Sequence, residues 1–513
     1  MTLHTLARRL LSLDRGSKPR PIVARGPTAP LAVERMEDRV NPVVTIAPLA
    51  DANGIIQVAN VGAAGTVTIR TEGADGLRIQ GTGAADVTYA AGTFRAINVV
   101  AADANPLTVL NPGGDTLAGI TSLRQVTVTG GGGDDVFNFA GAANANVYYK
   151  VDLGGGANTF VAADGGVNVL AFTQGAVGSV AVTPSAANNR TALWFRNVSS
   201  SVSANLNVTA GGSLANYGSM NVTLASGSNA QIIGVYGGSG NDTLIGNDAG
   251  NILIGFEGSD TVVGNGGADQ LNANRDFAPS VPGPVNAGGV ATVGAGTVID
   301  VSQFAAISGA FAGVPNQSAT AAALYANFGF FSFGEGVAAL GGAAGVNGTS
   351  LAADFATANA ITAVASTDTL TGGDGDDGHY GFNNARVSAT GLGGNDVFST
   401  NVNGLVSTYD GGDGNDLLIG AAGFTLLGGA GDDNLSFAVT NTAAPQPNQS
   451  TAVGGSGNDT ISAAFLNVLV DAGEGIDTVA MANSTLNTLV FVGSTTNVVG
   501  GIDAISQVTR ARR

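Results

Sequence analysis

An apolar residue recurs at every ninth position along residues 237–272, preceded each time by glycine and by an acid or an amide. Four blocks follow one another without a gap, and they read GGSGNDTLI, GNDAGNILI, GFEGSDTVV and GNGGADQLN. Aspartate or asparagine stands sixth in each block, and the eighth place holds Leu244, Leu253, Val262 and Leu271. This period predicts a short strand every nine residues, with a tight glycine turn between one strand and the next.

Other stretches alternate β-branched or aromatic residues with polar ones, which is the pattern of half-buried strands. They are TVTIRTEG (66–73), RQVTVTG (124–130), NVYYKVDLG (146–154) and SANLNVTA (203–210). Short strands with glycine turns and few helical patterns predict an all-β fold, a right-handed parallel β-solenoid or β-roll. Each coil of such a fold buries its apolar row only against its neighbours.

Looser copies of the block lie on both sides of the tandem run. Downstream, the sixth place holds Asp377, Asp396, Asp416, Asp433, Asp459 and Asp477, at steps of 19, 20, 17, 26 and 18 residues. Upstream, GGGGDDVFN (130–138) places Asp135 sixth, and LGGGANTF (153–160) has Asn158 in the acidic place. Two blocks make eighteen residues, so the downstream copies predict one marked turn per coil, whereas the tandem run marks both turns.

The residue types in these turns suit a hard divalent cation. Glycine permits a positive φ and lets backbone carbonyls turn inward, and the sixth-place acid adds a carboxylate. Such a cation takes six to eight oxygens at roughly 2.3–2.6 Å, which one turn cannot supply but two turns one coil apart can. The matching pairs are Asp242 with Asp260, Asn251 with Asp269, and Asp459 with Asp477. Asn251 offers a neutral oxygen, so we expect its site to be weaker.

The block resembles the hemolysin-type (RTX) calcium-binding nonapeptide, GGxGxDxUx. The resemblance implies several Ca²⁺ ions, each held between neighbouring turns by sixth-place side chains and glycine-turn carbonyls. The residues to which it assigns this role are Asp135, Gly237, Gly238, Gly240, Asp242, Asn251, Gly258, Asp260, Gly267, Asp269, Gly375, Asp377, Asp396, Gly414, Asp416, Gly431, Asp433, Gly457, Asp459, Gly475 and Asp477. The alternative is that the acids only form turns, by accepting hydrogen bonds from local N–H groups.

The repeats and their interruptions predict five segments. They are a basic, largely disordered leader (1–45), a β-solenoid with degenerate repeats (46–234), a tandem calcium-binding β-roll (235–275), an insertion (276–362) and a second calcium-binding repeat solenoid (363–513). The insertion is rich in Ala, Gly and Phe, and its Ala-rich stretches predict short helices. We expect its aromatic group to form a small core of its own, with docking to a partner or a membrane as the alternative; the group is Tyr325, Phe328, Phe330, Phe331 and Phe333.

The sequence of the N-terminal segment predicts an export signal. The stretch PLAVERMEDRVNP resembles the LExLEDRxxP leader near the N-termini of many planctomycete exported and surface proteins, with Val33 and Met36 where that pattern has leucine. The resemblance implies an extracellular or cell-surface location. The basic C-terminus, QVTRARR, departs from an uncleaved type I secretion signal. No stretch reaches the roughly 18 apolar residues of a membrane helix, so we expect a soluble body without a transmembrane helix.

Composition and charge limit the classes of molecule that the protein is expected to bind. The leader holds eight basic and four acidic residues, which leaves 12 basic and 34 acidic residues, a net charge of −22, for residues 46–513. Phosphate contacts need lysine and arginine, so nucleic acid is not an expected partner. The chain has no cysteine, which excludes disulfides and thiolate metal sites. Calcium ions, a surface polysaccharide or another surface protein are the expected partners.

Motifs for catalysis are missing from the sequence. HExxH, GxSxG and GxxxxGK[ST] do not occur. We expect His379 to be an exposed turn residue and Trp194 to pack in the solenoid. The favoured function is therefore a non-catalytic, Ca²⁺-stabilised surface or matrix scaffold or adhesin. The alternative is a β-helix carbohydrate-active enzyme, a polysaccharide lyase or epimerase, for which Tyr149, Lys150 and Asp152 are the candidates; otherwise they form a solvated outer row.

Overall fold

The computed structural model describes the solenoid and leaves the leader and the insertion outside its described residues. The described residues are 44–52, 54–60, 63–101, 105–111, 115–187, 191–272, 366–381, 385–400, 406–439, 450–463, 468–481, 488–491, 495–500 and 507–510. The predictions of a disordered leader and of helices in the insertion therefore lie outside this part of the chain.

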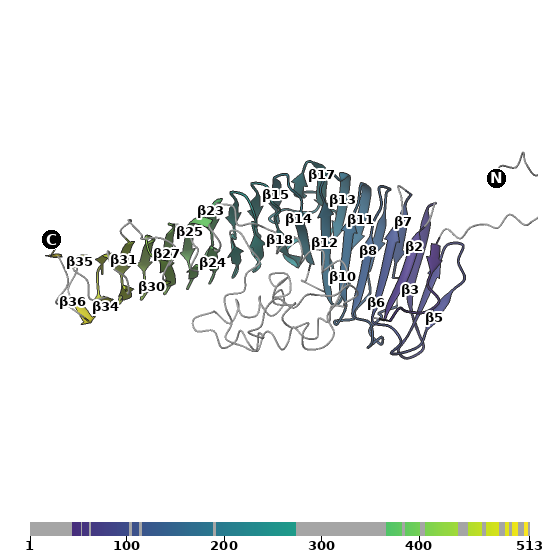
Figure 1. The fold of residues 1–513 in the computed structure, drawn as a ribbon, viewed down its shortest axis with the longest axis horizontal. Helices are drawn as coiled ribbons and strands as arrows, with labels where there is room; N and C mark the ends of the chain where they lie inside the picture. The colour runs from purple at the N-terminus through teal and green to yellow at the C-terminus, as the bar shows by residue number, and fades with distance from the viewer. Residues whose placement is uncertain are drawn as a thin grey trace, which may run out of the picture. The chain divides into compact units, whose positions relative to one another are not determined.

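Two sheets contain the described strands (Figure 1). Sheet A pairs, in this order, β1 (Val44–Ile46), β2 (Ile55–Asn60), β6 (Ala96–Ala101), β8 (Gln125–Thr129), β10 (Tyr148–Leu153), β12 (Val167–Thr173), β14 (Thr191–Asn197), β18 (Ile232–Tyr236), β20 (Ile252–Ile254), β22 (Gln270–Asn272), β24 (Gly378–Gly381), β26 (Val397–Thr400), β28 (Leu417–Ala421), β30 (Asn434–Val439), β32 (Thr460–Ala463), β34 (Ile476–Met481) and β36 (Thr495–Gly500).

Sheet B runs in one line of pairings from β5 to β37. Its strands are, in this order, β5 (Val87–Tyr89), β4 (Gly76–Gly81), β3 (Gly65–Glu72), β7 (Leu107–Leu110), β9 (Val136–Asn138), β11 (Gly156–Val161), β13 (Val177–Thr183), β17 (Ser219–Leu224), β16 (Ser213–Tyr217), β15 (Val202–Asn205), β19 (Thr243–Ile245), β21 (Thr261–Val263), β23 (Ser366–Thr371), β25 (Ala385–Gly393), β27 (Thr408–Asp413), β29 (Thr425–Ala430), β31 (Ser450–Ser456), β33 (Val468–Asp471), β35 (Thr488–Phe491) and β37 (Gln507–Arg510).

The chain alternates between the sheets, so that each regular coil contributes one strand to each. From β19 onward every pairing is parallel and joins strands one coil apart. Antiparallel pairs occur where β1 meets β2, where β4 lies between β3 and β5, and where β16 lies between β15 and β17. The one helix of the described residues is the short 3₁₀ helix η1 (Asn229–Gln231). The predicted parallel β-solenoid is confirmed, with antiparallel hairpins that the repeat pattern does not reveal.

The core lies between the two sheets and is one side chain deep in the tandem run. The eighth-place residues Leu244, Leu253, Val262 and Leu271 are fully buried in it. Coils upstream of the tandem run bury much more, because β10 alone places Tyr149, Val151 and Leu153 there, and Phe172 stacks on Phe195 with ring centroids 4.4 Å apart. The upstream coils therefore have a substantial apolar core, whereas each tandem block contributes a single large side chain.

His379 belongs to this core, which corrects the expectation of an exposed turn residue. The parallel register aligns it with Leu271 on one side and Phe398 on the other. Its ring is fully buried and stacks on Phe398, with centroids 4.4 Å apart and planes 4° apart. Neither ring nitrogen has a hydrogen-bond partner, and burial lowers the pKa of the imidazole to about 3. The register, which makes the eighth place a core position, overrides the polarity of the residue.

The solenoid continues across the insertion without a change of register. Strand β21 pairs with β23, and β22 pairs with β24, although 93 residues (273–365) lie between β22 and β23. The chain thus leaves the solenoid after one coil and resumes on the next.

Candidate metal centre

Glycine turns join the strands along two edges of the solenoid. At the first edge the chain passes from sheet A to sheet B, as between β18 and β19. At the second edge it passes from sheet B to sheet A, as between β21 and β22. Because coils repeat in register, each sixth-place residue lies directly beside the sixth-place residue of the neighbouring coil on the same edge.

The second edge carries a continuous ladder of sixth-place side chains. In each step, the backbone N–H of one residue donates to Oδ1 of its counterpart in the next coil, at 2.7–3.1 Å. The order is Asn251, Asp269, Asp377, Asp396, Asp416, Asp433, Asp459 and Asp477. All eight are buried. Each carboxylate is therefore fixed by the coil before it.

Asn251 stands at the N-terminal end of this ladder, and its side chain is held at both ends. Its Oδ1 accepts from the backbone N–H of Asn247 at 2.7 Å, and its Nδ2 donates to Oδ1 of Asn247 at 3.3 Å. Asn247 in turn donates through Nδ2 to the carbonyls of Asn229 and Ile232. An amide side chain suits this end position because its Nδ2 can donate a hydrogen bond, whereas the carboxylate side chains of the other ladder members only accept.

The first edge carries a shorter ladder of the same kind. Val202 donates to Asp242, Asp242 to Asp260, and Asp260 to Asp368, each from the backbone N–H to Oδ1 at 2.8 Å. Farther upstream, Leu107 donates to Asp135, and Asp135 donates to Oδ1 of Asn158. The sixth-place pairs expected from the one-coil spacing are therefore neighbours in space.

Asp368 is a ladder residue that the repeat pattern did not reveal. It is fully buried and takes the place after Asp260. The five residues before it, AVAST, contain no glycine, so the block lacks its usual signature. The one available signal is its spacing, because Asp368 stands nine residues before Asp377.

The second carboxylate oxygen distinguishes two kinds of turn. Oδ2 of Asp242, Asp377 and Asp135 accepts a backbone N–H from Gly238, Gly373 and Gly131 at 2.7–3.0 Å. In six other acids Oδ2 is buried and has no hydrogen-bond partner; they are Asp260, Asp269, Asp396, Asp416, Asp433 and Asp459. A buried carboxylate oxygen without a partner is costly, so this row calls for a cation or a proton.

Backbone carbonyls converge on the same space as these oxygens. A Cβ on Gly391, which stands first in its block, would lie 1.9 Å from Oδ2 of Asp396 and 2.3 Å from the carbonyl oxygen of Gly411 in the next coil. The fourth-place glycines pack as closely, since Gly475 has a φ of 142° and a Cβ there would lie 1.6 Å from the carbonyl oxygen of Gly457. Side chains at either place would fill the turn.

An exposed polar row flanks the second-edge ladder. It is formed by fifth-place residues, and its hydrogen bonds run in the opposite direction, from the N–H of one coil to the side chain of the preceding coil, as from Asn415 to Asn395 at 2.9 Å and from Asn458 to Asp432 at 2.7 Å. Together the two rows line a groove of about 600 Å³ between Asp376 and Thr460. The groove opens the acidic edge to solvent and to ions.

Burial and like charges act together on the ladder acids. Burial, the larger effect, and the neighbouring carboxylates together raise the pKa of Asp269 to about 8 and that of Asp396 to about 9. At the first edge, burial raises the pKa of Asp242 to about 6 and that of Asp260 to about 8. A metal-free ladder therefore disfavours the charged form that a cation would stabilise.

The oxygen set fits calcium. Among the described residues no group of three or more His, Cys, Asp or Glu side chains could hold a metal by itself. A site must therefore combine sixth-place carboxylates with carbonyls of the glycine turns, which are the hard oxygen ligands that Ca²⁺ takes. The unpartnered Oδ2 atoms and the converging carbonyls offer that combination. Every sixth-place acid predicted from the sequence lies on one of the two edges.

The three candidates for an enzyme do not share one face of the sheet. Tyr149 points into the core, whereas Lys150 and Asp152 lie on the outer face of sheet A. Lys150 is buried rather than solvated, since its Nζ lies 3.1 Å from Oδ1 of Asp152 and 5.8 Å from the ring centroid of Trp194. The expected solvated outer row is therefore wrong at Tyr149, which lies in the core, and at Lys150.

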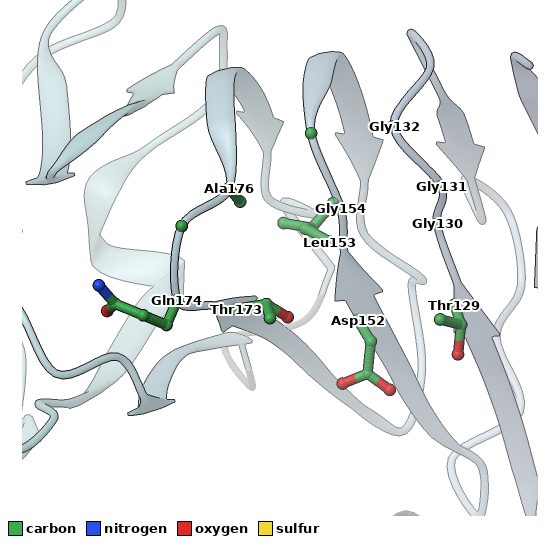
Figure 2. Close-up of a pocket in the computed structure, with 12 residues that line it drawn as sticks. Thr129, Gly130, Gly131, Gly132, Asp152, Leu153, Gly154, Thr173, Gln174 and Ala176 are labelled. Atoms are coloured by element: carbon green, nitrogen blue, oxygen red, sulfur yellow. The ribbon is translucent and has the colours of Figure 1, made fainter. Parts of the chain in front are cut away.

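The turns after β8, β10 and β12 leave a pocket of about 380 Å³ (Figure 2). Six of its twelve lining residues are glycine, and Thr129, Asp152, Thr173 and Gln174 contribute polar side chains. Oε1 of Gln174 accepts the backbone N–H of Ser199 at 2.7 Å, and Asp152 pairs with Lys150. Gln174 and Asp152 are thus already engaged, one by a hydrogen bond and the other by an ion pair.

Comparison with known families supports the assignment made from geometry. The family of the RTX calcium-binding nonapeptide repeat matches in four copies, over residues 236–271, 356–378 and 451–465. The second range includes Asp368. No curated protein and no solved structure matched the chain. None of the helices among the described residues has the length and apolar character to cross a membrane. In these segments the chain carries RTX calcium-binding nonapeptide repeats, which form a β-roll and bind several Ca²⁺ ions.

Proposed function

We propose that this protein is a non-catalytic extracellular scaffold or adhesin whose repeat solenoid is stabilised by calcium at the cell surface or in the matrix. The observation that carries the proposal is the set of six buried Oδ2 atoms without hydrogen-bond partners, five on the second edge and that of Asp260 on the first. These oxygens face neighbouring coils, so a bound cation would join one coil to the next.

The thin core explains why the repeats would depend on the ion. Between the sheets each tandem block buries one large apolar side chain, worth about 1.5–3 kcal/mol, and the chain has no cysteine for a disulfide. The stacked carboxylates also repel one another without metal. Binding free energy would then become folding free energy.

An extracellular location supplies the ion. Extracellular calcium modules bind at about 10⁻⁴–10⁻³ M, a concentration that the outside of a cell provides. The acidic body and the leader-like stretch PLAVERMEDRVNP agree with export. A surface polysaccharide or another surface protein is the proposed partner, and the groove along the second edge would reach it through bound calcium.

The test compares the full chain in EGTA, in millimolar calcium and in millimolar magnesium. We expect calcium, and not magnesium, to raise the β-sheet signal in far-UV circular dichroism and the melting temperature, because Mg²⁺ demands near-octahedral geometry and keeps its water. Identical spectra and melting curves in all three conditions would contradict calcium-driven folding. Cell fractionation with N-terminal sequencing tests the location, and depolymerisation of a polyuronate would favour the enzyme instead.

A further inference from the structure

The outer face of sheet A carries an apolar surface in the middle of the solenoid. Parallel register aligns its side chains in two rows that point away from the core between the sheets. One row contains Lys150, Val169, Ala192, Ile252 and Gln270, and the other contains Asp152, Ala171, Trp194, Tyr236, Ile254 and Asn272. We call these residues of β10 to β22 the outer rows.

Most of the outer rows are buried although they face outward. Trp194 is 4% exposed, Tyr236 is fully buried, and their rings stack with centroids 5.6 Å apart. The same sheet is more open on both sides of this stretch, since Val100 on β6 and Leu417 on β28 are half-buried. The outer rows therefore have a cover that the aligned positions Val100 on β6 and Leu417 on β28 lack.

The polar members of the rows support the same conclusion. Gln270 and Asn272 are about 1% exposed, and neither the nitrogen nor the oxygen of either amide has a hydrogen-bond partner among the described residues. Buried amides normally have partners. What covers the rows must supply donors and acceptors as well as apolar surface.

The segment that leaves from this face has the matching composition. Residues 273–365 begin directly after Asn272, at the end of the outer rows, and return at β23. Of these 93 residues only five are charged, whereas eight are phenylalanine. Such a segment needs apolar surface to bury, and its tether at Asn272 gives it a high effective concentration at the rows.

We propose that residues 273–365 dock on the outer rows of sheet A, so that the insertion shares a core with the solenoid instead of forming one of its own. Sheet A then has apolar side chains on both faces between β10 and β22, as sheets covered on both faces do. Docking would also account for the burial of Lys150, which pairs with Asp152 and lies beside the Trp194 ring.

The test uses Trp194, the one tryptophan of the chain. Deleting residues 273–362 removes 90 residues and leaves Asp368 and Asp377 eighteen residues after Asp260 and Asp269, because 108 − 90 = 18. We expect the deletion to red-shift the Trp194 emission and to raise its acrylamide quenching constant severalfold, with the calcium stoichiometry unchanged. Unchanged emission and quenching would overturn the proposal, as would concentration-dependent quenching in the full chain, which would assign the cover to a second copy.

A matched control and a second measurement keep the result independent of folding defects. In a Trp194→Phe background, Val100→Trp places the probe on the same face outside the covered stretch, and the deletion should leave its quenching unchanged. In the full chain, a photo-crosslinking residue at Ile254 should capture peptides from 273–365, and the same residue at Val100 should not. Capture at both positions or at neither would contradict docking on the outer rows.

Discussion

The backbone N–H of Asp260 donates to Oδ1 of Asp368 at 2.8 Å, although 108 residues separate the two in sequence. The same separation divides Asp269 from Asp377, which form the equivalent bond at 2.7 Å on the opposite edge. The insertion is therefore spliced between two coils whose edges remain continuous, and a calcium site can be built from residues on its two sides.

The first prediction concerns Asp368. Replacing it with alanine removes the carboxylate that follows Asp260 on the first edge, so Asp368→Ala should lower the calcium stoichiometry by about one ion, and Asp260→Ala should do the same. Isothermal titration calorimetry measures this directly. Thr369→Ala, at an exposed neighbouring position, should leave the stoichiometry intact. An unaltered stoichiometry in Asp368→Ala would restrict the role of this acid to the hydrogen bond with Asp260.

The second prediction concerns sharing of ions between coils. If Asp242 and Asp260 ligate one ion, replacing both with alanine should lower the free energy of calcium binding little more than replacing either one, because the effects of residues in contact are not additive. Calorimetric titration of the variants measures this. Asp242→Ala with Asp477→Ala should give additive losses, within about 0.5 kcal/mol, since the two acids lie on different ladders. Additive losses for Asp242 and Asp260 would show instead that each acid serves only its own turn.

The repeats could be predicted well from the sequence because the nine-residue period assigns each residue of a block to one structural position. Glycine, acid and apolar residue at fixed places determine turn, ladder and core at once, so the positions of Asp242 to Asp269 follow from counting. Asp368 escaped because its turn has no glycine, although the nine-residue spacing marks it. The hairpin of β16 and β17 escaped because alternation identifies strands but not whether neighbours run parallel.

Two further errors arose from judging side chains by their polarity. His379 stands eighth in its block, so the period places it in the core, where the register sets it between Leu271 and Phe398. Alternation correctly placed Lys150 on the face opposite Tyr149. Its burial depends on what covers that face, which no local pattern contains.

The third prediction concerns pH in the absence of metal. Burial raises the pKa of Asp433 to about 7 and that of Asp396 to about 9, against about 3.9 in an unfolded chain. At a pH between the unfolded and the folded pKa, the folded ladder therefore binds more protons than the unfolded chain. The stability of the EGTA-treated protein should accordingly fall as the pH rises from about 5 to about 8. In calcium the trend should reverse, because the ion competes with protons for the carboxylates. Thermal melts at both pH values, with and without EGTA, check the sign, and parallel trends would contradict it.

The fourth prediction concerns the buried imidazole. His379→Leu places an apolar side chain between Leu271 and Phe398 and removes two ring nitrogens that lack partners. Because burying such a polar group costs roughly 1–3 kcal/mol, the free energy of unfolding in calcium should rise by about that amount. Chemical denaturation measures it. Loss of stability would mean that the imidazole makes a favourable interaction which leucine cannot replace.

The last prediction concerns the end of the second-edge ladder. From the sequence alone, Asn251→Asp would add a charge and tighten the site shared with Asp269. In the structure, Nδ2 of Asn251 donates to Oδ1 of Asn247, whose own Nδ2 is engaged by two carbonyls and keeps that oxygen facing Asn251. A carboxylate there would set two acceptors against each other, so Asn251→Asp should lower the free energy of unfolding by about 1–3 kcal/mol.

The double variant Asn251→Asp with Asn247→Ser tests that reason, because it removes the opposing acceptor. We expect it to recover calcium affinity at this end of the ladder, as measured by calorimetric titration, while the single variant does not. A single variant that binds calcium more tightly than the natural chain, with no loss of stability, would show that the added charge outweighs the lost hydrogen bond and that Asn251 serves as a weak ligand and not as a cap.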